Sequence, residues 1–384
     1  MTTRTTTRTF ELGRLNEAGV RAILDGLSID GANVRSRELD PATGTLTVEL
    51  ARPEAAEHVE AFIANMRRTH KLIARKVRGE QRASNLQLRD VDADLASSAD
   101  VHLLGEGLVG LSGPLLHLFR FFERTFRQLA ARYAAEEQHY PVMVPSELLA
   151  ELGYFGHFPQ HITFCSHLPG DLPLLESVAA TAPGQVPERL ELAPPRHVLT
   201  PAVCLPCYRQ QRGAIIENVK TLTMQNHVFR YEGTRFRPLR RGWDFTVRDI
   251  VFFGSGEELT RLRADVVDHS LALCRELDLE ATVEVANDPF FLDASRDKAV
   301  YQRMGEVKLE LLFPMPEERD PLAASSFNLH RDFYTSVYDT RRPDGSLAES
   351  ACMGFGHERW VYAFLTQKGL DPAAWPDAVR SYLP

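Results

Sequence analysis

The sequence predicts an α+β fold in which helices flank a mainly antiparallel sheet, with a small α/β domain before it. Three observations support this expectation. Candidate strands in the second half are joined by turns and irregular loops, without the regular strand–helix alternation of a parallel sheet. Two long segments, Leu115 to Glu136 and Glu257 to Leu277, have the apolar spacing of amphipathic helices that can cover a sheet. The N-terminal region has its own short pattern of strands and helices.

The bulk composition narrows the class of protein. The 384 residues are 44% hydrophobic and 25% charged, with a mean hydropathy of -0.24, as in ordinary globular proteins. No apolar run approaches the roughly 18 residues that a membrane helix needs, so we expect no membrane association. Five cysteines in so long a chain do not make a disulfide framework, which favours a reducing, cytoplasmic setting. The net charge of -8 argues against extensive coating by nucleic acid, although not against a local basic patch.

Three parts are expected along the chain. They are a disordered tail over residues 1–8, a small N-terminal α/β domain with a basic connector over 9–100, and a large domain over 101–384. In the second part, the patterns predict strands at Thr9–Leu12, Val34–Leu39 and Leu46–Leu50, and helices at Leu15–Leu27 and from Pro53 to about Arg68.

The connector carries a run of basic residues with a single acidic one, Glu80. Its cations are Arg67, Arg68, Lys71, Arg75, Lys76, Arg78 and Arg82. The simpler interpretation is a solvated helix face. The alternative is a docking surface for a polyanion or for an acidic protein.

The large domain begins with a glycine-rich segment, Gly105 to Gly110, that formally matches G-x-G-x-x-G. A dinucleotide fold is disfavoured because no strand–helix–strand rhythm follows the match. After the helix predicted from Leu115, Tyr140 to Pro145 reads as a strand bounded by prolines. Further strands are expected at Val228–Tyr231, Phe245–Phe253, Ala281–Val285, Val307–Phe313, Ser325–Tyr338 and Glu349–Phe355.

A candidate nucleotide cradle lies between Phe229 and Phe245. Two antiparallel strands joined by a loop would bring Arg230, Glu232 and the loop residue Arg241 around one cavity. A guanidinium suits a phosphate, the Phe245 ring can stack on adenine, and a carboxylate can bind an amino group. The alternative is a surface hairpin whose arginines merely pair with carboxylates.

A second candidate phosphate element is the turn Cys352–Arg359. Gly354 and Gly356 allow close backbone approach, and Arg359 opens an amphipathic segment that continues to Leu365. A guanidinium at such a turn suits a polyphosphate.

These elements, taken in order, resemble motifs 2 and 3 of class II aminoacyl-tRNA synthetases. The helix from Leu115 and the strand ending at Pro145 resemble motif 1, which in that class builds a dimer interface. Either Pro145 or Ser146 occupies the proline position of that motif. From about Gly105 to Leu370 the chain more narrowly resembles amino acid:[carrier protein] ligases, which are related to atypical archaeal seryl-tRNA synthetases. Further similar strings are Gly153–Pro159 leading to Cys165, Leu199–Cys204, Asn287–Phe291, Lys308–Pro314 and Ser326–Asp332.

The resemblance implies a class II synthetase-type catalytic domain in a homodimer. Such an enzyme activates a small amino acid (glycine, alanine or serine) with Mg²⁺–ATP as aminoacyl-adenylate. It then transfers the acyl group to the phosphopantetheine thiol of a carrier protein. The positions that match family roles are Arg230 and Arg359 for catalysis, Glu232, Arg241, Gly242, Phe245, Lys308, Glu310, Ser325 and Ser326 for ATP, and Asn328 and Asp249 for the amino acid. For Lys308 and Glu310, the alternative is a surface charge pair two residues apart.

The resemblance also implies a catalytic Zn²⁺ held by Cys165, Asp249 and Cys352. Two thiolates and a carboxylate leave an open fourth position for the substrate amino group. Asp249 replaces the glutamate of the family and is one methylene shorter, and Glu232 is a possible substitute ligand. Cys204 and Cys207 form a competing C-x-x-C pair, for which buried structural thiols are the favoured interpretation. Cys274 is expected in the core.

Two other functions compete with the carrier-protein ligase. One is a seryl-tRNA synthetase-like enzyme, which is disfavoured because no large basic tRNA-binding extension is visible. The other is a non-catalytic paralogue, for which the departure at Asp249 is the best support. His330 and Asp332 are either a structural pair or site residues, and His357 is expected to be incidental.

Overall fold

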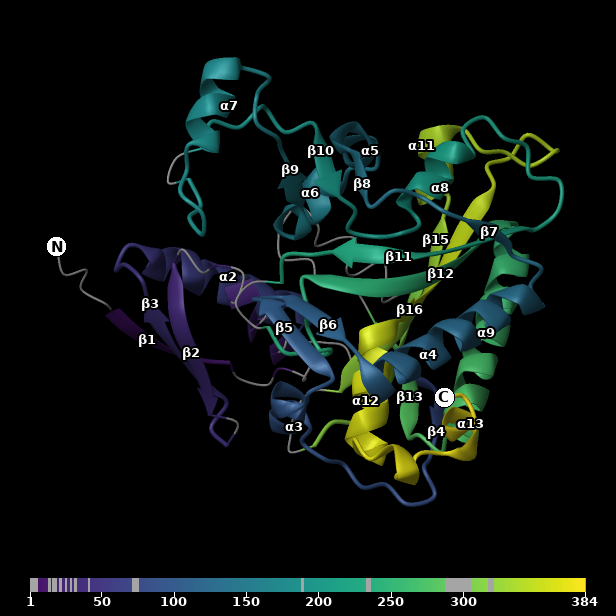
Figure 1. Cartoon of the computed structure of the whole chain (residues 1–384). Coiled ribbons are helices and arrows are strands. Elements are labelled where there is room, and N and C mark those ends of the chain that lie inside the picture. The colour runs from purple at the N-terminus through teal and green to yellow at the C-terminus, as the bar shows by residue number, and fades with distance from the viewer. Residues whose placement is uncertain are drawn as a thin grey trace.

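A computed structural model describes residues 6–383, except 13–14, 16–18, 21–22, 25, 28–29, 31–32, 41, 71–75, 188–189, 233–235, 287–304 and 317–320. Its centre is an eight-stranded sheet in the order β4-β13-β14-β15-β16-β12-β11-β7 (Figure 1). These strands are β4 Val77–Gln81, β7 Glu136–Gln138, β11 Lys220–Phe229, β12 Asp244–Gly254, β13 Ala281–Val285, β14 Lys308–Phe313, β15 Leu322–Arg331 and β16 Glu349–Gly356. All neighbours are antiparallel except β7 and β11, so the α+β expectation is confirmed.

One face of this sheet is covered by three helices: α4 Gly113–Arg132, α9 Gly256–Glu276 and α12 His357–Lys368. Their apolar faces bury an aromatic cluster in which Phe126 stacks on Phe355 at 4.8 Å and Phe313 meets Trp360 edge-on at 4.9 Å. Helix α9 starts with a capping box, because Ser255 and Glu258 satisfy each other's backbone N–H groups. Helix α4 ends four residues before the predicted Glu136, which belongs to β7 instead.

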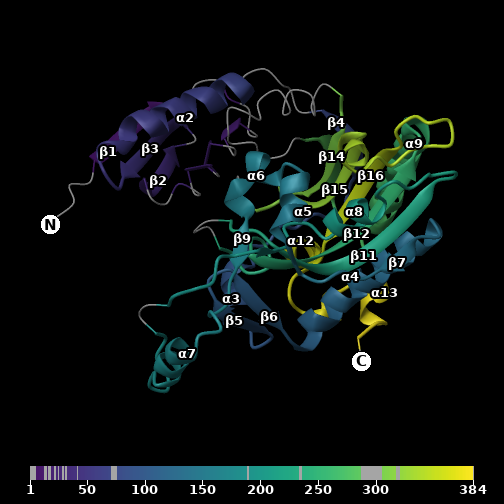
Figure 2. The same ribbon diagram turned by 90° about the horizontal axis from the view of Figure 1, so that it is seen from above.

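The opposite face carries a second, smaller layer. It contains the three-stranded sheet β8-β10-β9 and several short helices. The bounds are β8 Met143–Pro145, β9 Thr163–Cys165, β10 His197–Leu199, α5 Ser146–Glu151, α6 Tyr154–His157, η1 Pro159–His161, α8 Leu205–Gln210 and α11 Phe333–Tyr338. Helix α7 (Leu172–Ala179) projects away from this layer in both views (Figures 1 and 2). The strand predicted over Ser325–Tyr338 is correct only to Arg331, since the remainder forms α11.

The N-terminal unit lies to one side of the large sheet (Figures 1 and 2). It is a three-stranded antiparallel sheet in the order β1-β3-β2, formed by β1 Thr6–Glu11, β2 Val34–Asp40 and β3 Thr45–Leu50, with helix α2 Ala55–His70. Leu46, Val48 and Leu50 alternate inward on β3 and join Val59 and Ile63 of α2 in a separate core. The last residues of the predicted tail, from Thr6, are part of β1.

The described part of the basic run does not form one free helix face. Lys76 and Arg78 flank the start of edge strand β4 and both pair with Glu306. Arg82 pairs with Glu80 and Glu280. Arg67 is exposed on α2, whereas the side chains of Arg68, Lys71 and Arg75 lie outside the described residues. The ion pairs leave less unpaired positive charge than the sequence suggested.

The glycine-rich segment Gly105–Gly110 lies in a β-hairpin. Strand β5 (Val101–Gly105) turns into β6 (Leu108–Leu111), after α3 (Asp92–Ser97). Gly107 has φ +78°, and a Cβ there would lie 2.4 Å from the Trp243 ring. This glycine serves a tight turn packed on the β11–β12 connection. An antiparallel hairpin at this place agrees with the rejection of a dinucleotide fold. The chain ends in η3 (Pro372–Ala374) and α13 (Asp377–Arg380). Among the helices of the described residues, none is both long enough and apolar enough to cross a membrane.

Candidate active site

Strand register brings the polar residues of four strands to one face of the large sheet. Asp249 on β12 pairs with Gly354 on β16, which pairs with Ser326 on β15, which pairs with Glu310 on β14. One step along, Cys352 pairs with Asn328 and Asn328 with Lys308. Because successive residues of a strand point to opposite faces, these rows face away from α4, α9 and α12.

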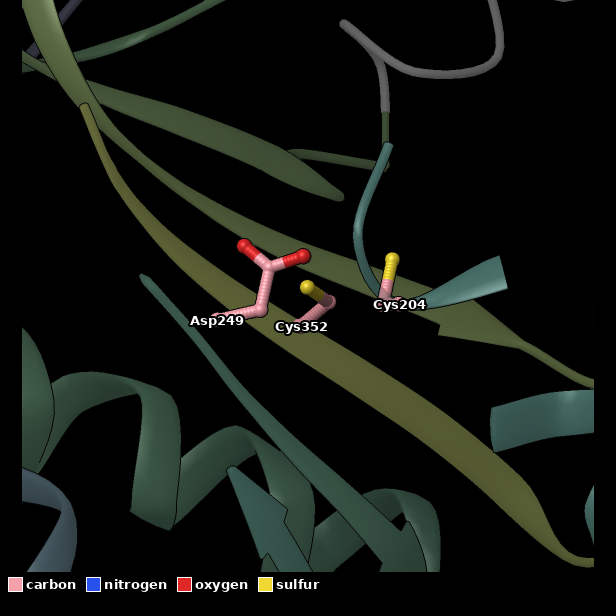
Figure 3. Close-up of side chains that lie close together, drawn as sticks. All are labelled: Cys204, Asp249 and Cys352. Atoms are coloured by element: carbon pink, nitrogen blue, oxygen red, sulfur yellow. The ribbon is translucent and has the colours of Figure 1, made fainter. Parts of the chain in front are cut away.

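Cys204, Asp249 and Cys352 form a compact group of possible metal ligands. Their donor atoms all lie within 4.8 Å of one another, and all three residues are buried. Asp249 and Cys352 project from neighbouring strands, and Cys204 comes from the loop above them (Figure 3). Gly354 keeps the space open, since a Cβ there would lie 2.9 Å from Asp249 Oδ1. We call these three residues the metal cluster.

The electrostatics of the metal cluster suit a cation. Burial raises the pKa of Asp249 to about 6, against hydrogen bonds from Cys204 and Cys352 that lower it. The pKa of Cys352 is raised well above its usual range, by its hydrogen bond with Cys204 and by burial. Three acidic groups are thus crowded together in a buried site, where a divalent cation would offset the cost of ionising them. Two sulfur donors and one carboxylate form a donor set that fits Zn²⁺ with an open position.

The metal cluster differs from the predicted one in a single donor. The structure brings Asp249 and Cys352 together as expected, but the third member is Cys204. Cys165 lies on β9, is partly exposed and is not part of the group. The sequence favoured Cys204 and Cys207 as a pair of buried structural thiols, and Cys207 is indeed fully buried. The sequence signal that points to Cys204 as a site residue is the family-like string Leu199–Cys204, which ends on it.

The arginines of the two phosphate elements converge beside the metal cluster. Arg241 Nη1 lies 3.2 Å from Glu232 Oε2. Burial acts to raise the pKa of Glu232, but the charges of Arg241, Arg359, His161 and Arg230 outweigh it and lower the pKa. Glu232 is therefore an ionised carboxylate surrounded by arginines, which we call the arginine cluster: Arg230, Arg241 and Arg359. Glu232 is not a member of the metal cluster.

Arg230 belongs to the arginine cluster, which it forms with Arg241 and Arg359 around Glu232, and its charge also acts on Asp249 of the metal cluster. Its Nε donates to the carbonyl oxygen of Pro201 at 2.8 Å, and its guanidinium carbon is 5.6 Å from the centre of the Phe245 ring. The positive charge of Arg230 lowers the pKa of both Asp249 and Glu232. One side chain thus acts on both halves of the site.

The remaining predicted residues divide between the two faces of the sheet. Lys308 and Glu310 form an ion pair of 3.0 Å, as the alternative interpretation expected, but on the site face and with Lys308 buried. Asn328 Nδ2 donates to Ser326 Oγ at 3.2 Å on the same face. Ser325 differs from expectation: its hydroxyl accepts a hydrogen bond from Trp360 Nε1 at 2.8 Å, on the helix-covered face.

Gly242 has a packing role in the structure. A Cβ at this position would lie 3.0 Å from the carbonyl oxygen of Asp244 and 3.2 Å from that of Gly107. Gly242 therefore allows the β11–β12 connection to approach the β5–β6 turn closely. Residues 233–235 of this connection and the family-like string 287–291 lie outside the described residues.

A buried polar network lies directly beneath the metal cluster. Arg248 is 2% exposed and donates to Glu123 of α4 through Nε and Nη2. Glu123 also lies 2.6 Å from Nε2 of His357, so this histidine is a member of the network and not incidental. Arg248 Nη1 donates to the hydroxyl of Thr223, which in turn donates to the carbonyl oxygen of Asp249.

Comparisons with known proteins agree with the sequence motifs. Two proteins of Bradyrhizobium diazoefficiens named amino acid--[acyl-carrier-protein] ligase 1 and 2 are 29% and 30% identical to this chain over 250 residues. Each alignment covers 65% of this chain, and 76% and 74% of the respective relative. The type-2 serine--tRNA ligase of Methanococcus aeolicus is 27% identical over 289 residues, which are 72% of this chain and 55% of that protein. No family model matches the chain.

Solved structures confirm the fold. M. kandleri SerRS, in complex with A. aeolicus tRNASec, has a TM-score of 0.72 at 20% identity, over 99% of this chain and 79% of that chain. Cytoplasmic serine-tRNA ligase from Naegleria fowleri, in complex with AMP, has a TM-score of 0.62 at 10% identity, over 86% of this chain and 71% of that one. At such identities the likeness shows the shared architecture alone.

Proposed function

The chain is a ligase of the amino acid--[acyl-carrier-protein] ligase family, and we propose that it activates a small amino acid with ATP and passes it to a carrier protein. The observation that carries this proposal is the position of Arg230. It acts on Glu232 in the arginine cluster and on Asp249 in the metal cluster, so the two clusters adjoin. A carboxylate held beside the metal cluster would therefore lie next to a phosphate held by arginines.

The proposed chemistry is adenylate formation. A carboxylate oxygen of the amino acid attacks the α-phosphorus of ATP, and pyrophosphate leaves with the electron pair of the broken P–O bond. No protein nucleophile is needed, because catalysis comes from positioning and from charge stabilisation. Arg230 and Arg359 would neutralise the charge that develops on the phosphates. Glu310 would supply a hard carboxylate oxygen of the kind that suits the Mg²⁺ of Mg²⁺–ATP.

The amino acid would be held on the site face of the sheet. Cys204, Asp249 and Cys352 would hold Zn²⁺, which supplies a fourth position for the α-amino group. Ser326 and Asn328 are small polar side chains directly beside this position in the strand register. The resemblance to the ligase family favours glycine, alanine or serine as substrate. The donor set thus supports selection for an amino group and against acids that lack one.

A carrier protein is favoured over tRNA as acceptor. The chain covers three quarters of the carrier-protein ligases at 29–30% identity, but 55% of the serine--tRNA ligase at 27%. The 27% identity to the type-2 serine--tRNA ligase, over 72% of this chain, keeps tRNA as the second candidate. However, the face of the N-terminal sheet that points away from its core is acidic. On this face Glu11, Glu38 and Asp40 lie opposite threonines of β3. Such an acidic face is unsuited to a phosphate backbone.

Three further assignments belong to this proposal. The chain would act as a homodimer through the motif 1 region, as the class II resemblance implies. The five cysteines are free thiols, in keeping with a reducing cytoplasm. The large domain from residue 101 onward would be the catalytic unit, and the N-terminal domain would be accessory to it.

ATP–pyrophosphate exchange with each amino acid, followed by transfer to holo carrier protein or to tRNA, tests the reaction. We expect exchange with one small amino acid and label transfer to the carrier protein. Exchange with none would support the non-catalytic alternative, and acylation of tRNA alone would replace the preferred acceptor.

Cys204→Ser and Cys165→Ser form a matched pair for the metal. Zinc content is expected to fall in Cys204→Ser and to stay unchanged in Cys165→Ser. A loss of zinc in Cys165→Ser alone would instead support Cys165, Asp249 and Cys352 as the ligands.

A further inference from the structure

Cys204 is the one member of the metal cluster that does not belong to the large sheet. Asp249 and Cys352 are fixed by strand pairing, whereas Cys204 is the residue before the short helix α8. The orientation of its sulfur therefore depends on what surrounds the start of this helix. Tyr208 lies four residues further along the same helix, a spacing that brings two side chains together.

The Tyr208 ring is held in place from three sides. It is 1% exposed and stacks on Tyr334 of α11, with 4.2 Å between ring centres. It meets Phe253 of β12 edge-on at 5.7 Å, and His330 of β15 at 5.9 Å. Contacts from a helix and two strands leave the phenol one position. Its hydroxyl is consequently a fixed point beside the metal cluster.

The Tyr208 hydroxyl lies between a histidine and a sulfur. Its oxygen is 3.0 Å from Nδ1 of His330. A hydrogen bond also joins the Tyr208 hydroxyl to the Cys204 sulfur. The hydroxyl therefore has a partner on each side, the imidazole of His330 and the sulfur of Cys204.

We propose that Tyr208 and His330 are positioning residues that orient the Cys204 sulfur for metal binding. In this arrangement, which rests on the proposed metal site, His330 Nδ1–H donates to the Tyr208 oxygen, and the Tyr208 hydroxyl donates to the sulfur. A phenol has one proton and cannot donate to both neighbours. The sulfur receives it because the metal-bound thiolate is the charged acceptor, and charge-assisted hydrogen bonds are the stronger ones. Neither residue touches the metal.

Zinc affinity of the purified protein, measured by competition with a chelator, tests this role. Tyr208→Phe keeps the ring and its stacking but removes the donor, so we expect affinity to fall about tenfold, within the roughly 10–100-fold range for partners of metal ligands. His330→Ala should weaken zinc binding as well. His330→Asn returns an N–H near the position of Nδ1 and should recover part of the affinity.

Tyr338→Phe is the matched control. Tyr338 is also 1% exposed, and its hydroxyl donates to Glu151 at 2.9 Å, outside the metal cluster. Its loss should lower thermal stability without changing zinc affinity. Co²⁺ gives a second readout, because the sulfur-to-metal charge-transfer band should move to lower energy in Tyr208→Phe and stay in place in Tyr338→Phe.

The outcomes separate this inference from the proposal beneath it. If Cys204→Ser binds zinc like the wild type, the metal site is wrong and the role of Tyr208 falls with it. If Cys204→Ser loses zinc while Tyr208→Phe binds it as tightly as the wild type, the metal site stands and the positioning role is overturned.

Discussion

Replacing Glu123 by alanine removes the main partner of a buried cation. Arg248 is 2% exposed and Glu123 is 26% exposed, and hydrogen bonds from both Nε and Nη2 join them. Burial acts to raise the pKa of Glu123, but His357 and Arg248 lower it overall, so the carboxylate is ionised. After the change, the partners that Arg248 keeps among the described residues are Thr223 at 3.1 Å and Glu137 at 3.3 Å.

The size of the loss follows from this geometry. Removing one partner of a buried ion pair costs about 3–5 kcal/mol, because a charge is left in the core. Glu137 is 45% exposed and offsets a part of this, so we expect about 3 kcal/mol, at the low end of that range. In a domain of this size, such a loss lowers the melting temperature by about 6 °C.

Thermal unfolding followed by near-ultraviolet circular dichroism measures the effect, with two variants for comparison. Arg248→Met removes the charge itself and leaves Glu123 within reach of water, so it should cost less than Glu123→Ala. Arg127→Ala breaks an exposed pair with Glu137 and should cost under about 0.5 kcal/mol. A Glu123→Ala shift no larger than that of Arg127→Ala, or smaller than that of Arg248→Met, would refute the reasoning.

Three further predictions address other parts of the chain. Gly354→Ala places a Cβ 2.9 Å from the cluster carboxylate and should weaken zinc binding, whereas Gly356→Ala meets only a carbonyl oxygen at 3.5 Å and should not, by chelator competition. Ser325→Ala leaves the Trp360 N–H buried without its acceptor and should cost about 1–3 kcal/mol in thermal unfolding, with pyrophosphate exchange per folded molecule unchanged. Hydrogen bonds from two cations beside β4 lower the pKa of Glu306 to about 2, so the stability it adds is present above about pH 4.5 and is lost as pH falls toward 2. Glu306→Gln should therefore be slightly less stable than wild type at pH 7, and pH-dependent melting should show the difference narrowing below about pH 4.5.

The local sequence pattern alone predicts several regular helices and strands of the large domain. Ala281–Val285 is a strand with the predicted bounds, and α9 differs from its prediction by one residue at each end. Helix α11 was missed because its aromatic and β-branched residues favour strands, while tertiary contacts decide otherwise. Thr335 donates to the carbonyl oxygen of Ala348, and Tyr334 stacks on Tyr208. Contacts of this kind leave no local signal.

The sequence predicts the candidate site only for those residues whose direction is set by the alternation of side chains along a strand. Asp249 and Cys352 meet because paired strands align them, as the motif order suggested. The same alternation argues that Ser325 and Ser326 cannot both face the site, and this signal was overlooked. Cys204 could not be placed from pattern alone, because its distance from the sheet depends on how the loop before α8 packs.

Hydrogen bonds through β12 connect the core on one face of the large sheet with the candidate site on the other face. Arg248 points into the core and is bound to Glu123 of α4, while its neighbour Asp249 points into the site. The Thr223 hydroxyl links them, since it accepts from Arg248 and donates to the carbonyl oxygen of Asp249. A site built on such a strand inherits the rigidity of the core, which is what metal and transition-state geometry require. The loop donor Cys204 lacks this support, and the contacts of Tyr208 are what replace it.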